Sequence, residues 1–546
     1  MLSELGSNLA IATVLSGTFV VLGSVLSSSW SHYSKVRKAM ISTEASPTEL
    51  FKSSIVRNIL LDPWSSVKKR AKAWSFLFRG PQVIQEGYNK ANGAPYEVFA
   101  PDNRYVLVSS DKHIREIDAA PDSVLSLQAA AKQLIQPKYT MHNFDWFDKR
   151  GVDGTPLVRT LRALLTNHIP DILPDIHSAT SAIFDQQLDS VPLRDGAKSV
   201  PLYPMVKEAV VFSNALAFFG PELAHDKAFL KSATDLIERT LLMAEIIRLV
   251  PGCIAHAAGR ILTYRYATDK AVHDALLPVV ERRLEERAQE KLGHSVAIHK
   301  DCIQWIMETS PKTKPWSGDR IVHELMALWF GSVHIVTTTI CFAVHDLCLH
   351  PEYLEPLRKE LQGAQRVGFE KSGKGLLLLD SFIRESARTT PVESMSTRRQ
   401  ALQPFSLSGG WKVDVGEWVC TPVRAMMKDP VYYAEPQEFH GFRFVDPGTL
   451  QEFGDGPDFK MPQRGDCAQL TDLDWQFWGT GRMACPGRFY AAAVMKTIIG
   501  LFITKYDLQL SEPEKSRWFI WRTSTYPKPS TAVLLRSRLD RIDFDL

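Results

Sequence analysis

The sequence has few cysteines, no excess of either charge and none of the common nucleotide-binding loops. Its seven cysteines are odd in number, scattered, and without C-x-x-C spacing. This argues against both a disulfide framework and a zinc site, and it places most of the chain in a reducing compartment. The 64 Lys and Arg residues are nearly balanced by 61 Asp and Glu residues. Such a balance gives no argument for nucleic acid as a partner. A Gly-x-Gly-x-x-Gly fingerprint, low-complexity runs and internal repeats are also missing.

The segment Leu9 to Leu26 is an apolar run of 18 residues without a charge. Its length is close to the ~20 residues that span a bilayer. Basic residues follow the run instead of preceding it, which predicts an anchor with the body of the protein on the cytosolic side. A buried core helix or a cleaved signal peptide is the alternative. We therefore expect two parts: a membrane anchor with its basic flank (1–40) and a catalytic domain (41–546).

Helical periodicity dominates the remaining chain, whose composition is that of a globular protein, with 45% hydrophobic and 23% charged residues. The clearest predicted helices are 156–173, 319–350 and 376–390; a proline ends each of the last two. Strand signals are confined to a hairpin over 96–109 and to alternation over 402–415. The predicted fold is a single large domain, mainly α with small β-sheets.

The stretch Trp478-Gly-Thr-Gly-Arg-Met-Ala-Cys-Pro-Gly487 places one cysteine, Cys485, between a glycine-rich turn and a predicted helix over 488–499. Unpaired N–H groups and the helix dipole at such a junction favour the thiolate, which is a metal ligand. Gly479 and Gly481 permit a tight turn with positive φ, and Gly487 has no side chain to keep a flat cofactor away.

Two further features precede the cysteine. Glu385-Ser-Ala-Arg388 puts a carboxylate and a guanidinium on one helix face, and Arg443 lies between Phe442 and Phe444. The order of these features resembles the cytochrome P450 superfamily, whose cysteine loop has the pattern Phe-x-x-Gly-x-Arg/His-x-Cys-x-Gly.

Gly481, Cys485 and Gly487 match that pattern, and Trp478 replaces its Phe. Met483 stands where the family has the Arg or His that pairs with a haem propionate. We do not expect the neighbouring Arg482 to substitute, because adjacent side chains point in different directions.

The resemblance implies a haem held between the 319–350 helix and the helix after the cysteine, with the Cys485 thiolate on the iron. It implies that Glu385, Arg388 and Arg443 form a buried, hydrogen-bonded triad that braces the cysteine loop. Arg162 and Arg399 match positions that pair with haem propionates, although each could be an ordinary surface arginine.

The distal side departs from the family pattern. Gly331-Ser-Val-His334-Ile335 stands where the family has Ala/Gly-Gly-x-Asp/Glu-Thr, so the usual acid and alcohol are replaced. Ser332 and Thr338 lie one helical turn from Ile335 and are candidate hydroxyls, and His334 could titrate near neutral pH and relay protons. Either Ser332, a water or a substrate hydroxyl completes the proton relay, or the enzyme does not perform ordinary oxygen insertion.

The resemblance extends to filamentous-fungal members of biosynthetic pathways, through the cysteine loop and the Asn143–Gly154 stretch. We expect a membrane-anchored haem-thiolate monooxygenase of the endoplasmic reticulum, with its catalytic domain cytosolic. It would use dioxygen and electrons from an NADPH-dependent flavoprotein reductase, since the chain has no dinucleotide fingerprint of its own. The expected reaction is hydroxylation, epoxidation or multi-step oxidation of a lipophilic intermediate such as a terpenoid, polyketide or alkaloid.

Two alternatives remain at this stage: a haem-thiolate isomerase or dehydratase that needs no external electrons, and a non-catalytic haem-binding protein. Phe144, Trp146 and Phe147 either line the substrate pocket or pack in the core. Gly368–Gly375 resembles a phosphate-binding loop but lacks the final Ser or Thr, so we interpret it as a solvated loop.

Overall fold

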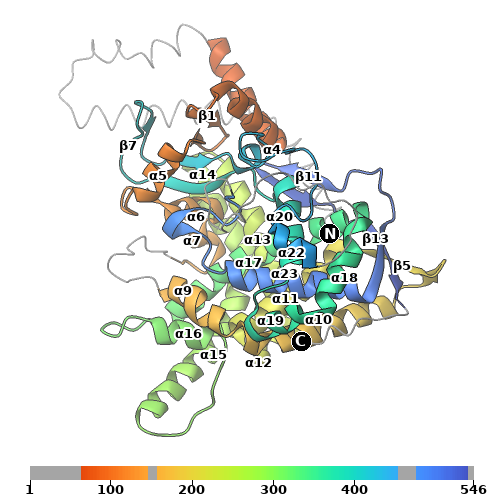
Figure 1. Ribbon diagram of the computed structural model, residues 1–546. Coiled ribbons are helices and arrows are strands. Elements are labelled where there is room, and N and C mark those ends of the chain that lie inside the picture. Colours follow the sequence, from red (N-terminus) through yellow and green to blue (C-terminus); the bar gives the residue numbers. More distant parts are fainter. Residues whose placement is uncertain (1–62, 145–155, 453–474, 539–546) are drawn as a thin grey trace, which may run out of the picture.

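The structure is a computed structural model that describes residues 63–144, 156–452 and 475–538. The expected anchor, Leu9–Leu26, and the 1–40 segment lie outside these residues. The described chain is mainly helical with small sheets (Figure 1). Its α-helices are α4 (Pro63–Ala91), α5 (Asp111–Ala119), α6 (Leu127–Ile135), α7 (Pro137–Thr140), α9 (Pro156–Arg159), α10 (Ile169–Asp189), α11 (Leu202–Phe219), α12 (Pro221–Ala224), α13 (Lys227–Leu249), α14 (Gly252–Tyr266), α15 (Thr268–Lys291), α16 (Cys302–Thr309), α17 (Gly318–Leu349), α18 (Leu354–Gln362), α19 (Ala364–Ser372), α20 (Leu377–Thr389), α21 (Val423–Met426), α22 (Pro447–Glu452) and α23 (Arg488–Lys505).

The central helix is α17, which runs through the middle of the molecule and packs against α11, α15, α20 and α23 (Figure 1). Its start is fixed by Ser317, whose side chain accepts a hydrogen bond from Arg320 N, and it ends just before His350 and Pro351. These bounds agree with the predicted 319–350 helix. Among the described helices, α17 alone has the length and apolarity of a membrane span, and it lies mostly buried inside the protein.

The helix after the cysteine, α23, continues five residues beyond Gly500, where the sequence pattern predicts a break. Gly500 and the following Leu501 and Phe502 are buried in the main hydrophobic core. Burial of such side chains contributes roughly 1.5–3 kcal/mol each, more than the ~1 kcal/mol that a glycine costs inside a helix. The tertiary packing therefore outweighs the local propensity.

The larger sheet has five strands in the order β1-β2-β9-β6-β3. Its first two strands form the predicted hairpin, with Tyr96 opposite Leu107. The sheet contains β1 (Tyr96–Phe99), β2 (Arg104–Leu107), β3 (Leu125–Ser126), β6 (Ser396–Ala401) and β9 (Trp418–Thr421).

The remaining strands form three smaller sheets that the sequence analysis largely missed. They are the four-stranded sheet of β10 (Tyr506–Leu510), β13 (Ala532–Ser537), β5 (Ala197–Pro201) and β4 (Leu193–Arg194), the pair β11 (Trp518–Trp521) and β12 (Ser524–Pro527), and the pair β7 (Phe405–Ser406) and β8 (Lys412–Val413). The alternation over 402–415 thus gives two strands of only two residues each.

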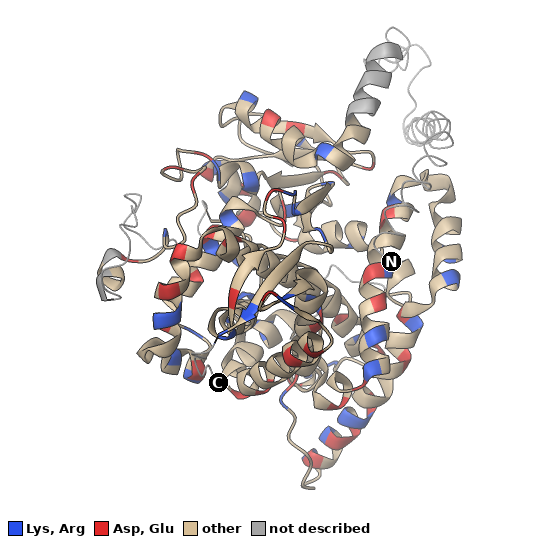
Figure 2. Cartoon of the chain, turned by 90° about the vertical axis from the view of Figure 1, so that its right-hand side faces the viewer, with Lys and Arg blue, Asp and Glu red and all other residues tan. Residues whose placement is uncertain are grey.

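Two further predictions are corrected. The expected helix 156–173 is divided into α9, the π-helix η1 (Thr160–Leu165) and α10, whose first turn contains Pro170. The expected solvated loop at Gly368–Gly375 lies largely within α19, which ends at Ser372 and is capped by Gly373 with φ of 66°. Acidic and basic residues alternate along the outer helices in Figure 2, in keeping with the balanced charge.

Candidate active site: the cysteine loop and the central helix

The cysteine loop is a tight turn between the 3-10 helix η3 (Gly481–Met483) and α23. The Cys485 N–H donates a hydrogen bond to the Trp478 carbonyl, 2.7 Å away. Gly479 and Gly481 have φ of 79° and 56°, as the turn requires. A Cβ on Gly481 would also lie 2.9 Å from the carboxylate of Asp118. Backbone conformation and space together therefore require glycine at 481.

Burial raises the pKa of the Cys485 thiol, while the Gly487 N–H and the guanidinium groups of Arg488 and Arg162 lower it; the balance is a raised pKa. The helix terminus was expected to favour the thiolate, but desolvation has the larger effect on the pKa of this sulfur. A metal ion bound at the sulfur would deprotonate it directly. The positive groups around the loop would then stabilise the resulting charge.

The predicted triad is brought together, and all three members are buried. Arg388 donates from Nε and Nη2 to the two Glu385 oxygens at 2.7 and 2.8 Å, and Arg443 Nε donates to Glu385 Oε2 at 2.9 Å. The remaining guanidinium N–H groups reach backbone carbonyls of Met427, Ala434, Glu435, Pro436 and Glu438. The His440 N–H also donates to Glu385. The buried charges are therefore compensated, as a triad of this kind requires.

The two arginines matched to haem propionates both lie close to the cysteine loop. Arg162, on the π-helix η1, donates to the carbonyls of Arg482 and Ala484 at 2.8 and 3.2 Å. Arg399, on β6, is buried, and burial lowers its pKa to about 10. Its Nη2 has no hydrogen bond and lies 3.6 Å from Asp118 Oδ1. A buried guanidinium of this kind suits a further anionic partner.

The side chain of Arg482 points elsewhere, as expected. It donates to the Ala120 carbonyl and to Asp122 Oδ1, at the end of α5. Met483 is buried and brings no charge to the loop. The sequence analysis missed Asp118, which binds Thr480 at 3.0 Å and faces Arg399. No motif marks this residue, because it belongs to an ordinary amphipathic helix far away in sequence.

The central helix presents an open face in its middle. Ile335 is 41% exposed although most of the helix is buried, and a Cβ on Gly331, one turn earlier, would meet no atom within 4 Å. A Cβ on Gly487, in the cysteine loop, would also meet none. Because α17 packs against α23, these open positions belong to neighbouring elements. A thiol, two open glycine positions and two arginines near the loop are the features that a haem with two carboxylates needs.

The three residues of α17 that were candidates for the proton relay lie in different environments. His334 is half-buried, with Nδ1 3.3 Å from the Tyr203 hydroxyl, and desolvation of the ring lowers its pKa to about 4. It therefore stays neutral near pH 7, which corrects the expected titration there. Ser332 Oγ donates to the Trp329 carbonyl, and Thr338 is fully buried with no hydrogen bond to its hydroxyl.

Thr339, which the sequence analysis missed, donates its hydroxyl to the Ile335 carbonyl at 2.8 Å. It lies four residues after Ile335 and so shares its face of the helix. The i+4 spacing was visible in the sequence, but three successive threonines (337–339) gave no reason to choose this one.

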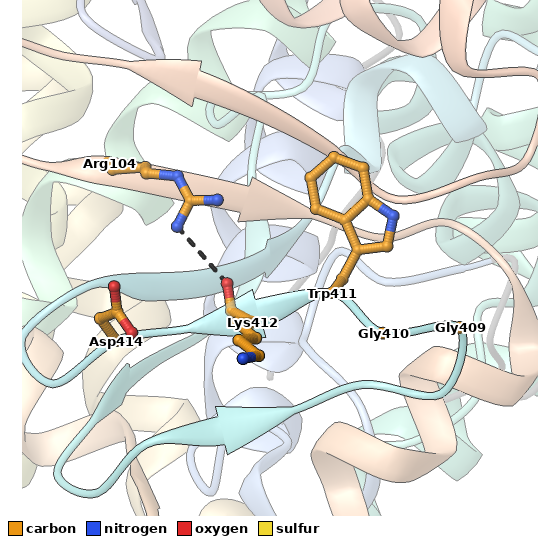
Figure 3. Close-up of a pocket in the computed structure, with 6 residues that line it drawn as sticks. All are labelled: Arg104, Gly409, Gly410, Trp411, Lys412 and Asp414. Carbon is orange, nitrogen blue, oxygen red and sulfur yellow. Dashed lines mark hydrogen bonds between the residues drawn. The ribbon is translucent and has the colours of Figure 1, made fainter. Parts of the chain in front are cut away.

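Of the aromatic residues proposed to line a pocket, Phe144 is buried and stacks on His323, with ring centroids 4.9 Å apart. Trp146 and Phe147 lie outside the described residues. A separate surface pocket beside β8 (Figure 3) is lined by Arg104, Gly409, Gly410, Trp411, Lys412 and Asp414. None of these residues belongs to α17 or to the cysteine loop, so this pocket is not part of the candidate active site.

The fold and the cysteine loop together define a protein of the haem-thiolate class. The family model described as Cytochrome P450 matches residues 154–532. The chain belongs to the cytochrome P450 family, and it is a P450 monooxygenase.

Relatives of the chain include fungal P450 monooxygenases. Cytochrome P450 monooxygenase 71 of Postia placenta is 26% identical over 490 residues, covering 88% of this chain and 93% of that protein. Cytochrome P450 monooxygenase ptmQ of Penicillium ochrochloron is 27% identical over 479 residues, covering 85% and 88%. Among solved structures, the retinoic acid-bound cyanobacterial CYP120A1 is 16% identical with a TM-score of 0.59, over 85% of this chain and 97% of that one. That similarity supports the fold alone.

Proposed function

We propose that this monooxygenase oxidises a lipophilic small molecule, an intermediate of fungal secondary metabolism such as a terpenoid, polyketide or alkaloid. The observation that carries the proposal is the open face of α17, where the exposed group in the middle of a buried helix is the apolar side chain of Ile335. Apolar walls favour apolar ligands, because binding removes both surfaces from water. The fungal relatives named above are monooxygenases as well.

Residues on the two sides of the site would have different roles. Cys485 would hold the iron, with the triad of Glu385, Arg388 and Arg443 keeping its loop in place. Arg162 and Arg399 would neutralise the two haem carboxylates. When bound, a haem with an axial thiolate supplies the activation of dioxygen for insertion into substrate.

The distal residues would manage protons without the usual alcohol at position 335. Ile335 excludes water from its part of the face, and His334 is held neutral against α11. Thr339 then offers a hydroxyl on the same face, next to the carbonyl of Ile335. The isomerase, the dehydratase and the haem-binding protein without catalysis have no support in the family or in the names of the relatives.

The proposal includes the cellular setting. The uncharged run Leu9–Leu26 would anchor the protein in the endoplasmic reticulum membrane, with residues 41–546 as the cytosolic catalytic domain. Electrons would come from an NADPH-dependent flavoprotein reductase. Both parts are motivated by the sequence pattern and by the family.

The test uses the full chain expressed in microsomes with a fungal reductase. We expect a thiolate-type band in the carbon-monoxide difference spectrum of the reduced protein. We also expect NADPH consumption that rises with members of a terpenoid, polyketide and alkaloid panel, with label from ¹⁸O₂ in the product. Cys485→Ala should abolish the band and Cys253→Ala, at an exposed cysteine, should keep it. Product that forms without NADPH, or without the label, would contradict the proposal.

A further inference from the structure

Three side chains that the active site does not use meet where α17 begins. They are His273 on α15 and Asp319 and His323 on α17, and their ligand atoms all lie within 4.8 Å of one another. The two histidines are buried, whereas Asp319 is exposed. The cluster is therefore built on two rigid helices and is open to solvent on one side.

The hydrogen bonds of His323 leave one of its nitrogens facing a carboxylate. Its Nε2 lies 3.0 Å from the carbonyl oxygen of His142, which can only accept, so Nε2 carries the hydrogen. In the neutral ring, Nδ1 is then a lone pair, and it lies 3.4 Å from Asp319 Oδ2. Two acceptors at this separation repel each other unless a cation lies between them.

The second histidine completes the arrangement. His273 Nε2 lies 2.9 Å from Asp319 Oδ1, so Asp319 offers one oxygen to each ring. The other nitrogen of His273 has no hydrogen bond and lies 3.7 Å from Asp274 Oδ1. Metal-binding histidines usually give their second nitrogen to a carbonyl or a carboxylate, and His323 does so through the His142 carbonyl.

We propose that His273, Asp319 and His323 form a binding site for a divalent transition-metal ion, with zinc the natural occupant. Two imidazoles and one carboxylate are the donors that Zn²⁺ accepts, with solvent in the remaining position. Ligands at about 2.1 Å from zinc in a tetrahedron lie roughly 3.4 Å apart, so a cluster whose ligand atoms lie within 4.8 Å of one another needs only a small contraction around the ion. The nearby Arg320 is bound to Glu324 and lies over the Phe144 ring.

A metal at this position would join α15 to the first turn of the central helix. Because the His323 ring stacks on Phe144, the metal would also be linked to the loop after α7, where Phe144 lies. The site is a structural one and is independent of the haem and of the proposed substrate.

The test measures zinc in the haem-loaded enzyme after removal of any polyhistidine tag. Protein is dialysed against a chelator and then against zinc buffered at a series of free concentrations, and zinc and iron are counted by elemental mass spectrometry. All variants carry Cys253→Ser, because that thiol is exposed. We expect about one zinc per haem iron, and a rise in the thermal midpoint with zinc.

Asp319→Asn should weaken zinc binding at least about tenfold, since it removes a ligand while its exposed position leaves folding intact. His273→Gln and His323→Gln should do the same. The matched control is His294→Gln, an exposed histidine outside the cluster, which should bind as the parent does. The proposal is overturned if the parent holds no more zinc than Asp319→Asn, or if His294→Gln loses as much as the cluster variants.

Discussion

The hydroxyl of Thr339, a buried side chain, donates a hydrogen bond to the backbone carbonyl of Ile335, 2.8 Å away, one turn after the open position of the central helix. Ile335 occupies the position where the family has a hydroxyl side chain. Side-chain bonds to a carbonyl one turn earlier compete with the helix ladder and loosen it locally. Thr339 therefore supplies to this turn both a hydroxyl and the loosening that Ile335 cannot give.

We predict that Thr339→Val uncouples the reaction. The variant keeps the shape and loses the hydroxyl, so the product formed per NADPH consumed should fall about tenfold or more, with peroxide released in its place. Positioned proton transfer contributes ~10²–10⁴-fold to enzymatic rates, which sets the scale. The measurement is the ratio of NADPH, product and peroxide with the best substrate of the panel.

The matched control is Thr337→Val, a buried threonine on the opposite side of the same helix. It should leave the ratio within about twofold of wild type, well inside the range that proton transfer spans. Ile335→Thr, which restores the usual hydroxyl, should rescue Thr339→Val. Equal coupling in wild type and Thr339→Val would show that the hydroxyl takes no part.

A second prediction concerns the triad. Arg388→Ala leaves Glu385 buried with one cation fewer, and breaking a buried pair in this way costs roughly 3–5 kcal/mol. We expect the haem content per protein to fall sharply and the free energy of unfolding to drop by about that amount. Absorbance in the Soret band against total protein, and urea unfolding, give the two numbers.

The comparison for this variant is Arg366→Ala, which removes an i,i+4 ion pair with Glu370 on α19. A partly exposed pair of this kind contributes about 0–1 kcal/mol, so haem content should be unchanged. Full haem retention in Arg388→Ala would show that the triad does not support haem binding.

Features set by local sequence were predicted well. The helix 319–350 follows from periodicity and a stopping proline, and the 96–109 hairpin follows from two short runs around a turn. The i,i+3 spacing predicts the Glu385–Arg388 pair, whereas Arg443 was added to it only by the family resemblance. Features that need a distant partner were not predicted. β5 becomes a strand because it pairs with β13, more than 300 residues away. Asp118 reaches the cysteine loop only through the fold. Likewise, the i,i+4 pair Asp319 and His323 meets His273 of the proposed metal site only because α15 packs against α17.

A third prediction tests the open space at Gly487. A Cβ there would meet no protein atom within 4 Å, so the protein itself should tolerate Gly487→Val. If the haem lies against this backbone, however, the valine occupies its place. We expect normal helix content by circular dichroism together with loss of haem. Gly252→Val is the control, because its Cβ also meets nothing within 4 Å and it lies at the start of α14, outside the cysteine loop and α17. Haem loss in both variants, or in neither, would contradict this placement.

The fourth prediction follows from Asp346, near the end of the central helix. Burial raises its pKa to about 7, against the opposing effects of the Ser386 hydroxyl and Arg517. The folded protein thus keeps a proton that the unfolded chain, with a carboxyl pKa near 3.9, releases. Protonation of Asp346 therefore stabilises the folded protein by at most about 4 kcal/mol. This contribution is fully present below about pH 4 and is lost as the pH rises to about 7.

Asp346→Asn stays neutral at every pH and can still accept the hydrogen bond from Ser386. Its free energy of unfolding, relative to wild type, should therefore be higher at pH 8 than at pH 5.5, which urea unfolding at the two pH values measures. The difference between variant and wild type cancels the other titrating groups. One of these groups is Glu360, because burial also raises its pKa to about 7. A difference that stays constant with pH would mean that Asp346 is already ionised in the folded protein at pH 5.5, and that Arg517 and Ser386 outweigh its burial.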